Sequence, residues 1–218
     1  AKVEASILNA SNGPIYLAKD AEIMEGCVVR GPLALSEHAA LKMACKVYGP
    51  TTLGPHCKAG GELNNAVFFG YSNKAHDGFL GNSVIGEWCN LGADTNNSNL
   101  KNNYGSVDVY SYKEGKSIDT GLQFCGLIMG DHSKSGINTM FNTGTVVGVS
   151  ANIFGGDFPP KFIPSFSWGG AQWLRTFMFE KAVEVAQKMM ERRGLKLEEA
   201  DLHILKTVFE REEKNRKK

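Results

Sequence analysis

The feature that most constrains the fold is a six-residue repeat that begins near residue 17. Eight aliphatic positions recur at this interval without a miss: Leu17, Ile23, Val29, Leu35, Leu41, Val47, Leu53 and Ala59. Four residues after each of the first seven comes a mostly small residue: Ala21, Cys27, Leu33, Ala39, Cys45, Thr51 and Cys57. An amphipathic helix repeats every 3.6 residues and a strand every 2, so a period of six fits neither. It fits a coil of short strands and tight turns, in which each rung stacks on the rung below.

The same period returns twice further along the chain. It covers residues 85–95, and it then runs from residue 129 to residue 153. Hexads of this kind form parallel β-helices, and in the left-handed type about three hexads complete one triangular coil. We therefore expect a mainly β fold, a left-handed parallel β-helix of hexapeptide repeats with a C-terminal helical tail.

Two interruptions divide the expected β-helix domain, which spans residues 1–158, from the rest of the chain. The first is an excursion at 96–127, where the period is lost. Within it, residues 107–112 (VDVYSY) and 116–122 (KSIDTGL) are candidate hairpin strands. The second is a connector rich in Gly, Pro and aromatic residues, which we expect to end the coil.

Residues 159–218 are expected to form this connector and the C-terminal helices. The stretch 171–194 carries apolar residues at three- and four-residue steps, which predicts an amphipathic helix, and Gly194 is a candidate C-cap. Residues 197–218 predict a second helix with a charged end. The apolar helix faces are expected to pack on the coil or on a neighbouring subunit.

Composition excludes several classes of function. The formal net charge is +1, so neither a nucleic acid nor an anionic membrane is expected as the main partner. No apolar run approaches the roughly 20 residues that a membrane span needs, and the N-terminus lacks the regions of a signal peptide. Five cysteines without a CxxC pair predict small buried thiols in a reducing cytoplasm. No spacing of His, Cys, Asp and Glu predicts a metal site.

A histidine stands where the repeat breaks off. The stretch 75–81 (AHDGFLG), followed by 83–86 (SVIG) and 90–95 (NLGADT), resembles the acetyltransferase half of bifunctional sugar-1-phosphate nucleotidylyltransferase/acetyltransferases. The motif of that family reads approximately G-H-x-x-Y-L-G-D, I-G and N-x-G-A-G-T, with a later Asn. The resemblance covers residues 15 to about 155, and it leaves out the helical tail.

The resemblance implies a homotrimer with active sites between subunits, acetyl-CoA along the outside of the coils, and an amino sugar phosphate as acceptor. On this basis His76 would be the general base that takes a proton from the attacking amine. Asn90 would line the sugar site, and Asn99 would match the later Asn that holds the acceptor. Ile137 and Gly155 would offer backbone groups to the coenzyme A arm.

Some positions depart from the family pattern. Asn64 stands where the family has a lysine that contacts the acceptor, and Phe79 replaces the tyrosine of the motif. Lys46 matches a basic position of the family only loosely. Lys101 or Lys74 are then the candidates for contacts with the acceptor phosphate.

The chemistry of these residues agrees with the implied reaction. An ammonium group cannot attack a thioester, so a neutral base with a pKa near ambient pH is needed, and histidine meets that need. Amide side chains suit sugar hydroxyls, and a backbone amide suits the oxyanion. Of the other histidines, His132 is the second choice for the base, whereas His38 and His56 are expected in exposed turns.

Two functions from different classes remain open. The first is an acetyl-CoA-dependent N-acetyltransferase that acts on an amino sugar phosphate or a nucleotide-linked amino sugar, which His76, Asn90 and Asn99 favour. The second is a catalytically decayed trimerisation or regulatory domain of a sugar-1-phosphate nucleotidylyltransferase, which Asn64 and Phe79 favour. Members of the family that this chain resembles carry a nucleotidylyltransferase domain before the coil. Because this chain starts with Ala rather than Met, we expect such a domain to precede it in a longer protein.

Overall fold

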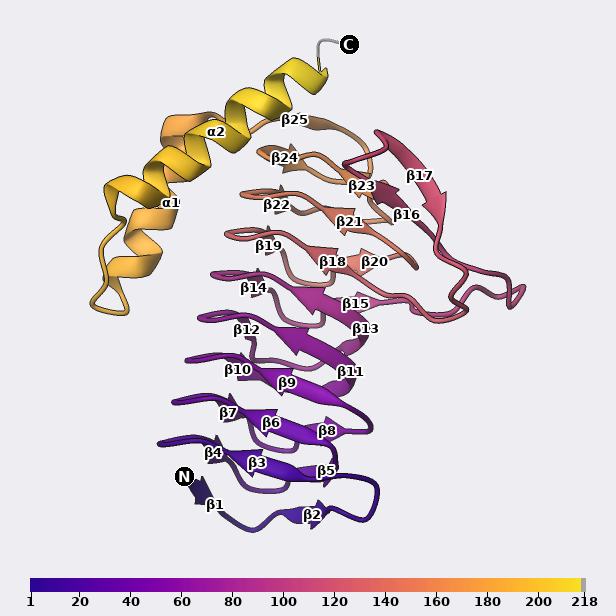
Figure 1. Cartoon of the computed structure of the whole chain (residues 1–218), viewed down its shortest axis with the longest axis vertical. Helices are drawn as coiled ribbons and strands as arrows, with labels where there is room; N and C mark the ends of the chain where they lie inside the picture. The colour runs from indigo at the N-terminus through magenta and orange to yellow at the C-terminus, as the bar shows by residue number, and fades with distance from the viewer. Residues whose placement is uncertain (217–218) are drawn as a thin grey trace.

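The computed structural model describes residues 1–216, and within them the chain forms a left-handed parallel β-helix of about nine turns followed by two helices (Figure 1). This confirms the fold predicted from the hexads. Each turn of the coil has three sides, here called faces A, B and C, joined by corners AB, BC and CA. Face A contains β1 (Lys2–Val3), β4 (Glu22–Ile23), β7 (Ala40–Leu41), β10 (Lys58–Ala59), β12 (Asn73–Lys74), β14 (Asn90–Leu91), β19 (Lys134–Ser135), β22 (Asn152–Ile153) and β24 (Ser167–Gly169).

Faces B and C share two long strands, β11 (Glu62–Phe68) and β13 (Phe79–Ile85), which run across corner BC. The other strands of face B are β2 (Ile7–Asn9), β5 (Val28–Arg30), β8 (Lys46–Val47), β15 (Asn96–Asn97) and β20 (Met140–Phe141). Those of face C are β3 (Ile15–Leu17), β6 (Leu33–Leu35), β9 (Thr51–Leu53), β18 (Ile128–Met129), β21 (Val146–Val147) and β23 (Phe162–Ile163).

The repeat residues fill the interior of the coil. In the regular turns, strand partners are separated by three full hexads, as in the pairs Glu22–Ala40 and Leu33–Thr51. Seven of the eight aliphatic positions and all seven small positions are buried, and Leu17 is partly buried. The five cysteines are free and buried, which confirms their prediction as small apolar residues.

Two turns of the coil are shortened, and this explains why the hexads are lost between residues 59 and 85. Lys58 pairs with Asn73, whereas a turn of three full hexads would bring it to His76. Asn73 pairs with Asn90, whereas a full turn would bring it to Leu91. The first of these turns is shorter because the link from β10 to β11 at corner AB loses two residues and β11 runs through corner BC with one residue fewer. The second is shorter because β13 also runs through corner BC with one residue fewer. This irregularity positions the histidine of the predicted site, which lies in the turn between β12 and β13.

The excursion leaves the coil at corner BC. Its predicted strands are confirmed as a hairpin of β16 (Asp108–Ser111) and β17 (Lys116–Asp119). The hairpin packs on the top of face C, where the rings of Tyr110 and Phe162 are stacked 3.5 Å apart. Residues 96–97, expected in the excursion, are instead β15 of the coil and pair with β20.

The coil continues past its expected end at residue 158, because β23 and β24 add a further turn. This turn is also shortened, since Val146 pairs with Phe162 where a full turn would reach Pro164. The first helix begins later than the expected residue 171. Residues 174–176 form β25 (Leu174–Thr176), antiparallel to β24, and α1 (Phe179–Glu191) follows. Gly194 has a φ of +71° just after α1, which confirms it at the end of this helix.

The two helices are attached to the top of the coil. α2 (Glu199–Arg216) packs on Phe166 at corner CA, with Phe209 edge-on at 5.0 Å. Arg216 donates hydrogen bonds to the carbonyl oxygens of Ser165 and Phe166 at 2.7 and 2.9 Å. In the described part of the chain, neither helix has the length and apolar character to cross a membrane.

Candidate active site

His76 lies at corner AB, in the turn that joins β12 to β13. Its side chain and that of Asp77 are exposed. The turn closes at Gly78, whose φ of +119° favours glycine, and a Cβ there would collide with the carbonyl oxygen of Thr95 in the next turn of the coil. Glycine at this position therefore lets the histidine turn stack tightly on the turn above it.

A buried lysine fastens this turn from inside the coil. Lys74 is fully buried, and its Nζ donates to the carbonyl oxygens of Gly60, His76 and Asp77 at 3.4, 2.9 and 3.1 Å. All three donors of the ammonium group are thus used. Burial lowers the pKa of Lys74 to about 8. Lys74 was a candidate for phosphate contacts, but inside the coil it supports the backbone beneath His76.

The predicted coenzyme contacts lie along the same edge as His76. The N–H of Asp94 donates to the carbonyl oxygen of Asp77, and that of Asn138 donates to the carbonyl oxygen of Ala93, so successive turns stack along corner AB. Ile137, on this column, is 70% exposed.

Gly155 belongs to the next turn of the column, after β22. A Cβ on Gly136 would lie 3.2 Å from Cβ of Phe154, which shows that the two turns are in contact. His76 and Gly155 are therefore separated by three strand spacings, about 14 Å along the coil. His76, Ile137 and Gly155 therefore lie on one continuous edge at corner AB. The roles of His76 as base and of Ile137 and Gly155 as coenzyme contacts stay predictions.

The predicted acceptor residues gather elsewhere, at corner BC. Asn64 pairs in register with Gly81, and the ring tip of Phe79 and the amide of Asn99 both lie over Gly81. Asn99 donates a hydrogen bond of 2.7 Å to Oδ1 of Asn82. Asn64, Phe79 and Asn99 thus form one cluster at the far end of face B from the histidine turn.

Two of the predicted substrate-binding lysines are engaged with carboxylates. Nζ of Lys46 lies 3.4 Å from Glu62, and Nζ of Lys101 lies 2.9 Å from Asp108. Asn90 is on a third surface, the outside of face A, where it pairs in register with Asn73 and Lys134. One copy of the chain therefore does not bring His76, Asn90 and Asn99 together.

A column of aromatic rings at corner CA was not predicted. The rings of His38, His56, Tyr71, Trp88 and His132 are stacked one above the other, with centroids 4.7, 4.8, 4.2 and 6.3 Å apart. The spacings of these five residues in the sequence are irregular, so the sequence does not show that their rings stack. What they share is one position in the turn, where φ is near +60°. Burial lowers the pKa of His132 to about 4, which keeps it neutral at ambient pH.

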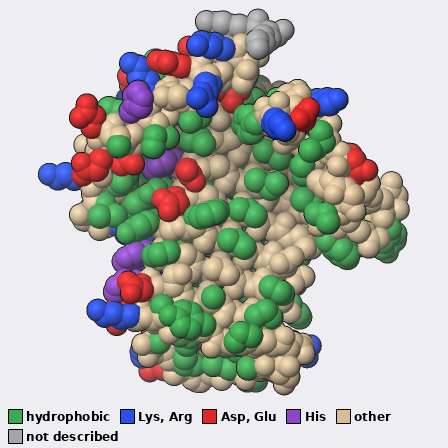
Figure 2. All heavy atoms as spheres, viewed as in Figure 1, with side chains coloured by type: hydrophobic (Ala, Val, Ile, Leu, Met, Phe, Trp, Pro, Cys, Tyr) green, Lys and Arg blue, Asp and Glu red, His purple; other side chains and the backbone are tan. Residues whose placement is uncertain are grey.

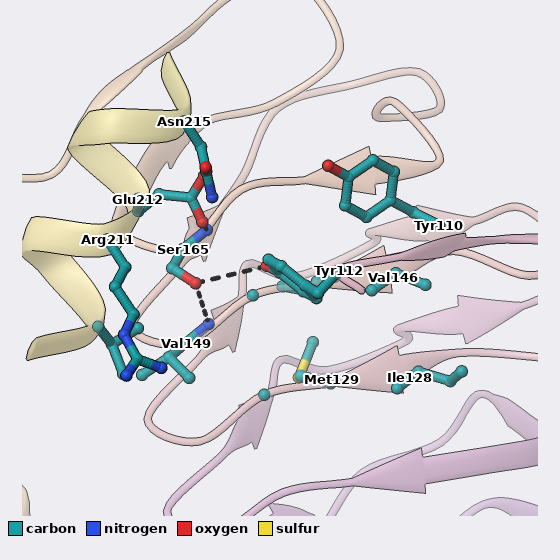
Figure 3. Close-up of a pocket in the computed structure, with 14 residues that line it drawn as sticks. Tyr110, Tyr112, Ile128, Met129, Val146, Val149, Ser165, Arg211, Glu212 and Asn215 are labelled. Atoms are coloured by element: carbon teal, nitrogen blue, oxygen red, sulfur yellow. Dashed lines mark hydrogen bonds between the residues drawn. The ribbon is translucent and has the colours of Figure 1, made fainter. Parts of the chain in front are cut away.

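A hollow of about 580 Å³ lies between the hairpin, face C and α2 (Figure 3). Tyr112 borders it from the hairpin and Ile128 from face C. Arg211 and Glu212 face it from the helix. Its lining includes no histidine or lysine, and its one carboxylate, that of Glu212, is buried and accepts a hydrogen bond of 3.1 Å from the N–H of Ser165. Among residues 1–216, no three His, Cys, Asp or Glu side chains are grouped as a metal site.

No family model matches the chain. Over 95 residues it is 33% identical to the bifunctional sugar-1-phosphate nucleotidylyltransferase/acetyltransferase of Sulfurisphaera tokodaii, a match that covers 44% of this chain and 23% of that protein. Over 92 residues it is 30% identical to the bifunctional protein GlmU of Methanococcus maripaludis, covering 42% of this chain and 22% of that protein. The resemblance seen in the motifs is thus confirmed over about two fifths of the chain. The chain spans less than a quarter of the length of these relatives.

Solved structures show weaker likeness. The polysialic acid-specific acetyltransferase NeuO is 12% identical, with a TM-score of 0.45 over 88% of this chain and 94% of that one. The UDP-N-acetylglucosamine acyltransferase of Arabidopsis is 15% identical, with a TM-score of 0.26 over 89% of this chain and 76% of that one. The architecture of this chain therefore rests on its own strand pairing.

Proposed function

We propose that this chain is an acyltransferase domain that moves the acetyl group of acetyl-CoA to the amine of an amino sugar phosphate or a nucleotide-linked amino sugar. The observation that carries the proposal is corner AB, where His76, Ile137 and Gly155 form one edge about 14 Å long. The acetyltransferase names of the relatives, which match about two fifths of the chain, support the same class of reaction.

In this reaction the amine nitrogen attacks the thioester carbonyl carbon, a C–N bond forms, and the C–S bond breaks. The thiolate of coenzyme A leaves and takes up a proton, and the proton lost by the nitrogen goes to the imidazole of His76. A neutral imidazole has a free nitrogen lone pair that can accept this proton. A backbone N–H of corner AB would stabilise the oxyanion.

A homotrimer is part of the proposal, because it would complete the site. His76 and the cluster of Asn64, Phe79 and Asn99 lie at different corners of one chain, and contact between neighbouring copies can bring different corners together. Apolar side chains on the outside of face C offer a surface for such contact (Figure 2). Val67 and Val84, which pair in register there, are each 40% exposed.

The test is thiol release from acetyl-CoA in the presence of a panel of amino sugar phosphates. We expect His76→Ala to lower kcat by about 10²- to 10⁴-fold, the range typical for loss of a general base. His203→Ala is the matched control, because His203 is exposed on α2. Turnover that is unchanged in His76→Ala would overturn the role of this histidine.

The second candidate is a trimerisation or regulatory domain whose acetyltransferase site has decayed. Asn64 and Phe79 favour it, and so do the ion pairs that engage Lys46 and Lys101. A stable trimer without turnover on any acceptor would favour this second function. In either case we propose that a nucleotidylyltransferase domain belongs to the same longer protein, and that the protein works in the cytoplasm, to which its free buried cysteines are suited.

A further inference from the structure

A cleft of about 650 Å³ lies between face A and the last turn of α1. Its floor is a row of outward side chains on β10, β12, β14 and β19: Lys58, Asn73, Asn90 and Lys134. The row crosses three strand spacings, about 14 Å, with a lysine at each end and an amide at each middle position. Both residue types donate hydrogen bonds to oxyanions.

α1 lies beside the upper part of the coil (Figure 1), and its last turn borders the cleft. Lys188, Arg192 and Arg193 reach the cleft from the end of the helix, and Nη2 of Arg193 donates to Oδ1 of Asn73 at 3.4 Å. Tyr71 and Trp88, whose rings are stacked at 4.2 Å, form the side of the cleft at corner CA.

The charges that line the cleft are all positive. Its lining holds three lysines and two arginines and no carboxylate. Of these five cations only Lys188 takes part in an ion pair among residues 1–216, with Glu184 at 2.6 Å. Nζ of Lys134 donates to the carbonyl oxygen of His132 at 2.9 Å, which leaves two of its three donors available. Like charges that converge in this way destabilise the fold unless an anion lies among them.

Basic residues at a helix C-terminus have a structural explanation, because they complement the helix dipole. That explanation covers Lys188, Arg192 and Arg193. It does not cover Lys58 and Lys134, which approach from the facing surface of the coil. Basic groups on both walls of one cleft are the arrangement that holds phosphate.

We propose that this cleft binds the phosphate groups of a small phosphorylated ligand, held between the Lys58–Lys134 row and the end of α1. Ala75 lines both the cleft and the hollow at His76, so a ligand held here extends toward the proposed base. The phosphate can come from the acceptor sugar or from the diphosphate of coenzyme A. The choice of these two sources rests on the proposed acetyl transfer.

The test uses isothermal titration of the full chain with inorganic pyrophosphate at low ionic strength. We expect saturable binding that weakens at least about tenfold in the double variant Lys58→Gln/Lys134→Gln and that weakens as salt is added. Lys113→Gln/Lys116→Gln removes the same charge from the exposed hairpin and should leave the affinity unchanged. If the Lys58→Gln/Lys134→Gln variant does not fold, Arg192→Gln/Arg193→Gln is used in its place, because it removes two cations from the helix side of the same cleft.

Competition then identifies the source of the phosphate. Displacement of pyrophosphate by coenzyme A assigns the cleft to the coenzyme, and displacement by glucosamine 1-phosphate assigns it to the acceptor. Absence of saturable binding, equal affinity in the cleft and hairpin variants, or displacement by neither compound overturns the proposal. Because binding is measured without turnover, a phosphate site in an inactive protein would contradict the proposed reaction and leave the site standing.

Discussion

At the scale of single residues, Lys74 links the interior of the coil to the turn that carries the proposed base. A lysine can occupy the interior because its in-register neighbour is the small Ala59 and because the shortened turn brings three carbonyl oxygens within reach. Two of these oxygens belong to His76 and Asp77. The position of the proposed base therefore depends on a side chain that is buried inside the coil.

Lys74→Met keeps the length of this side chain and removes its donors. We expect the free energy of unfolding to fall by about 1–3 kcal/mol, because buried carbonyl oxygens lose their partner. We also expect kcat to fall while KM for acetyl-CoA stays unchanged, since the histidine turn loses its support. Leu53→Ala, a core change in a regular part of the coil, is the matched control. A variant that loses stability to the same extent as this control and keeps its kcat would show that Lys74 is only structural.

His132 gives the fold a dependence on acid. Burial lowers its pKa from the ordinary 6.5 to about 4, with the nearby Lys134 adding to the effect and Asp201 opposing it. Between these two pH values the unfolded chain binds a proton that the folded chain does not, so stability falls as pH falls from 6.5 toward 4. Chemical denaturation at several pH values should show a loss of about 3 kcal/mol that His132→Phe reduces. An identical pH profile in that variant would assign the acid sensitivity to other groups.

At the scale of elements, the aromatic column of corner CA explains why several bulky residues adopt positive φ. Trp88 has a φ of +58° and is only 6% exposed, with Tyr71 stacked on it at 4.2 Å. The left-handed conformation is unfavourable for such residues, so the stacking and burial must offset its cost. The column thereby fixes one wall of the cleft between face A and α1.

Trp88→Ala should lower the free energy of unfolding by about 3–5 kcal/mol in urea denaturation, the range for removal of a buried tryptophan. Tyr104→Ala is a close control, because Tyr104 has the same φ of +58° but is 68% exposed. Its loss should change stability by less than about 0.5 kcal/mol. Equal effects of the two substitutions would mean that stacking contributes nothing to the corner.

The regular turns could be predicted from the sequence because every inward residue there repeats at six. Glu62–Phe68 and Phe79–Ile85 could not, since each runs through a corner and shifts the register of the hexads that follow it. The turn built on Phe162 and Trp168 was missed for a related reason, because the prolines before it resemble a connector.

As with the fold, some residues of the proposed sites could be predicted from the sequence and others could not. His76 was predicted from a local motif and Ile137 from the family resemblance, and the two residues lie on one edge of the structure. Lys58 and Lys134 are far apart in the sequence and meet in one cleft through two shortened turns and an excursion. No local pattern carries that information.

At the scale of the whole molecule, the outside of face C bears on how copies assemble. Tyr16, Val67, Val84 and Ile128 lie in one register row, interrupted by Ala34 and Thr52, and the hairpin covers only its upper end. Figure 2 shows the hydrophobic side chains on this side of the molecule. A row of this kind is suited to contact with a second copy.

Val67→Glu should convert the proposed trimer to monomers, because burying an unpaired carboxylate at a subunit contact costs several kcal/mol. Sedimentation velocity checks the mass, and the thiol-release assay on the same samples checks whether turnover disappears with the trimer. Ile118→Glu adds the same charge to the exposed strand β17 and should leave both unchanged. A monomeric parent chain with full turnover would show that one copy is sufficient for the reaction. If the Val67→Glu variant is still a trimer, face C is excluded as the subunit contact. Face B, where Phe79 and Asn64 lie, would then be the next candidate for that contact.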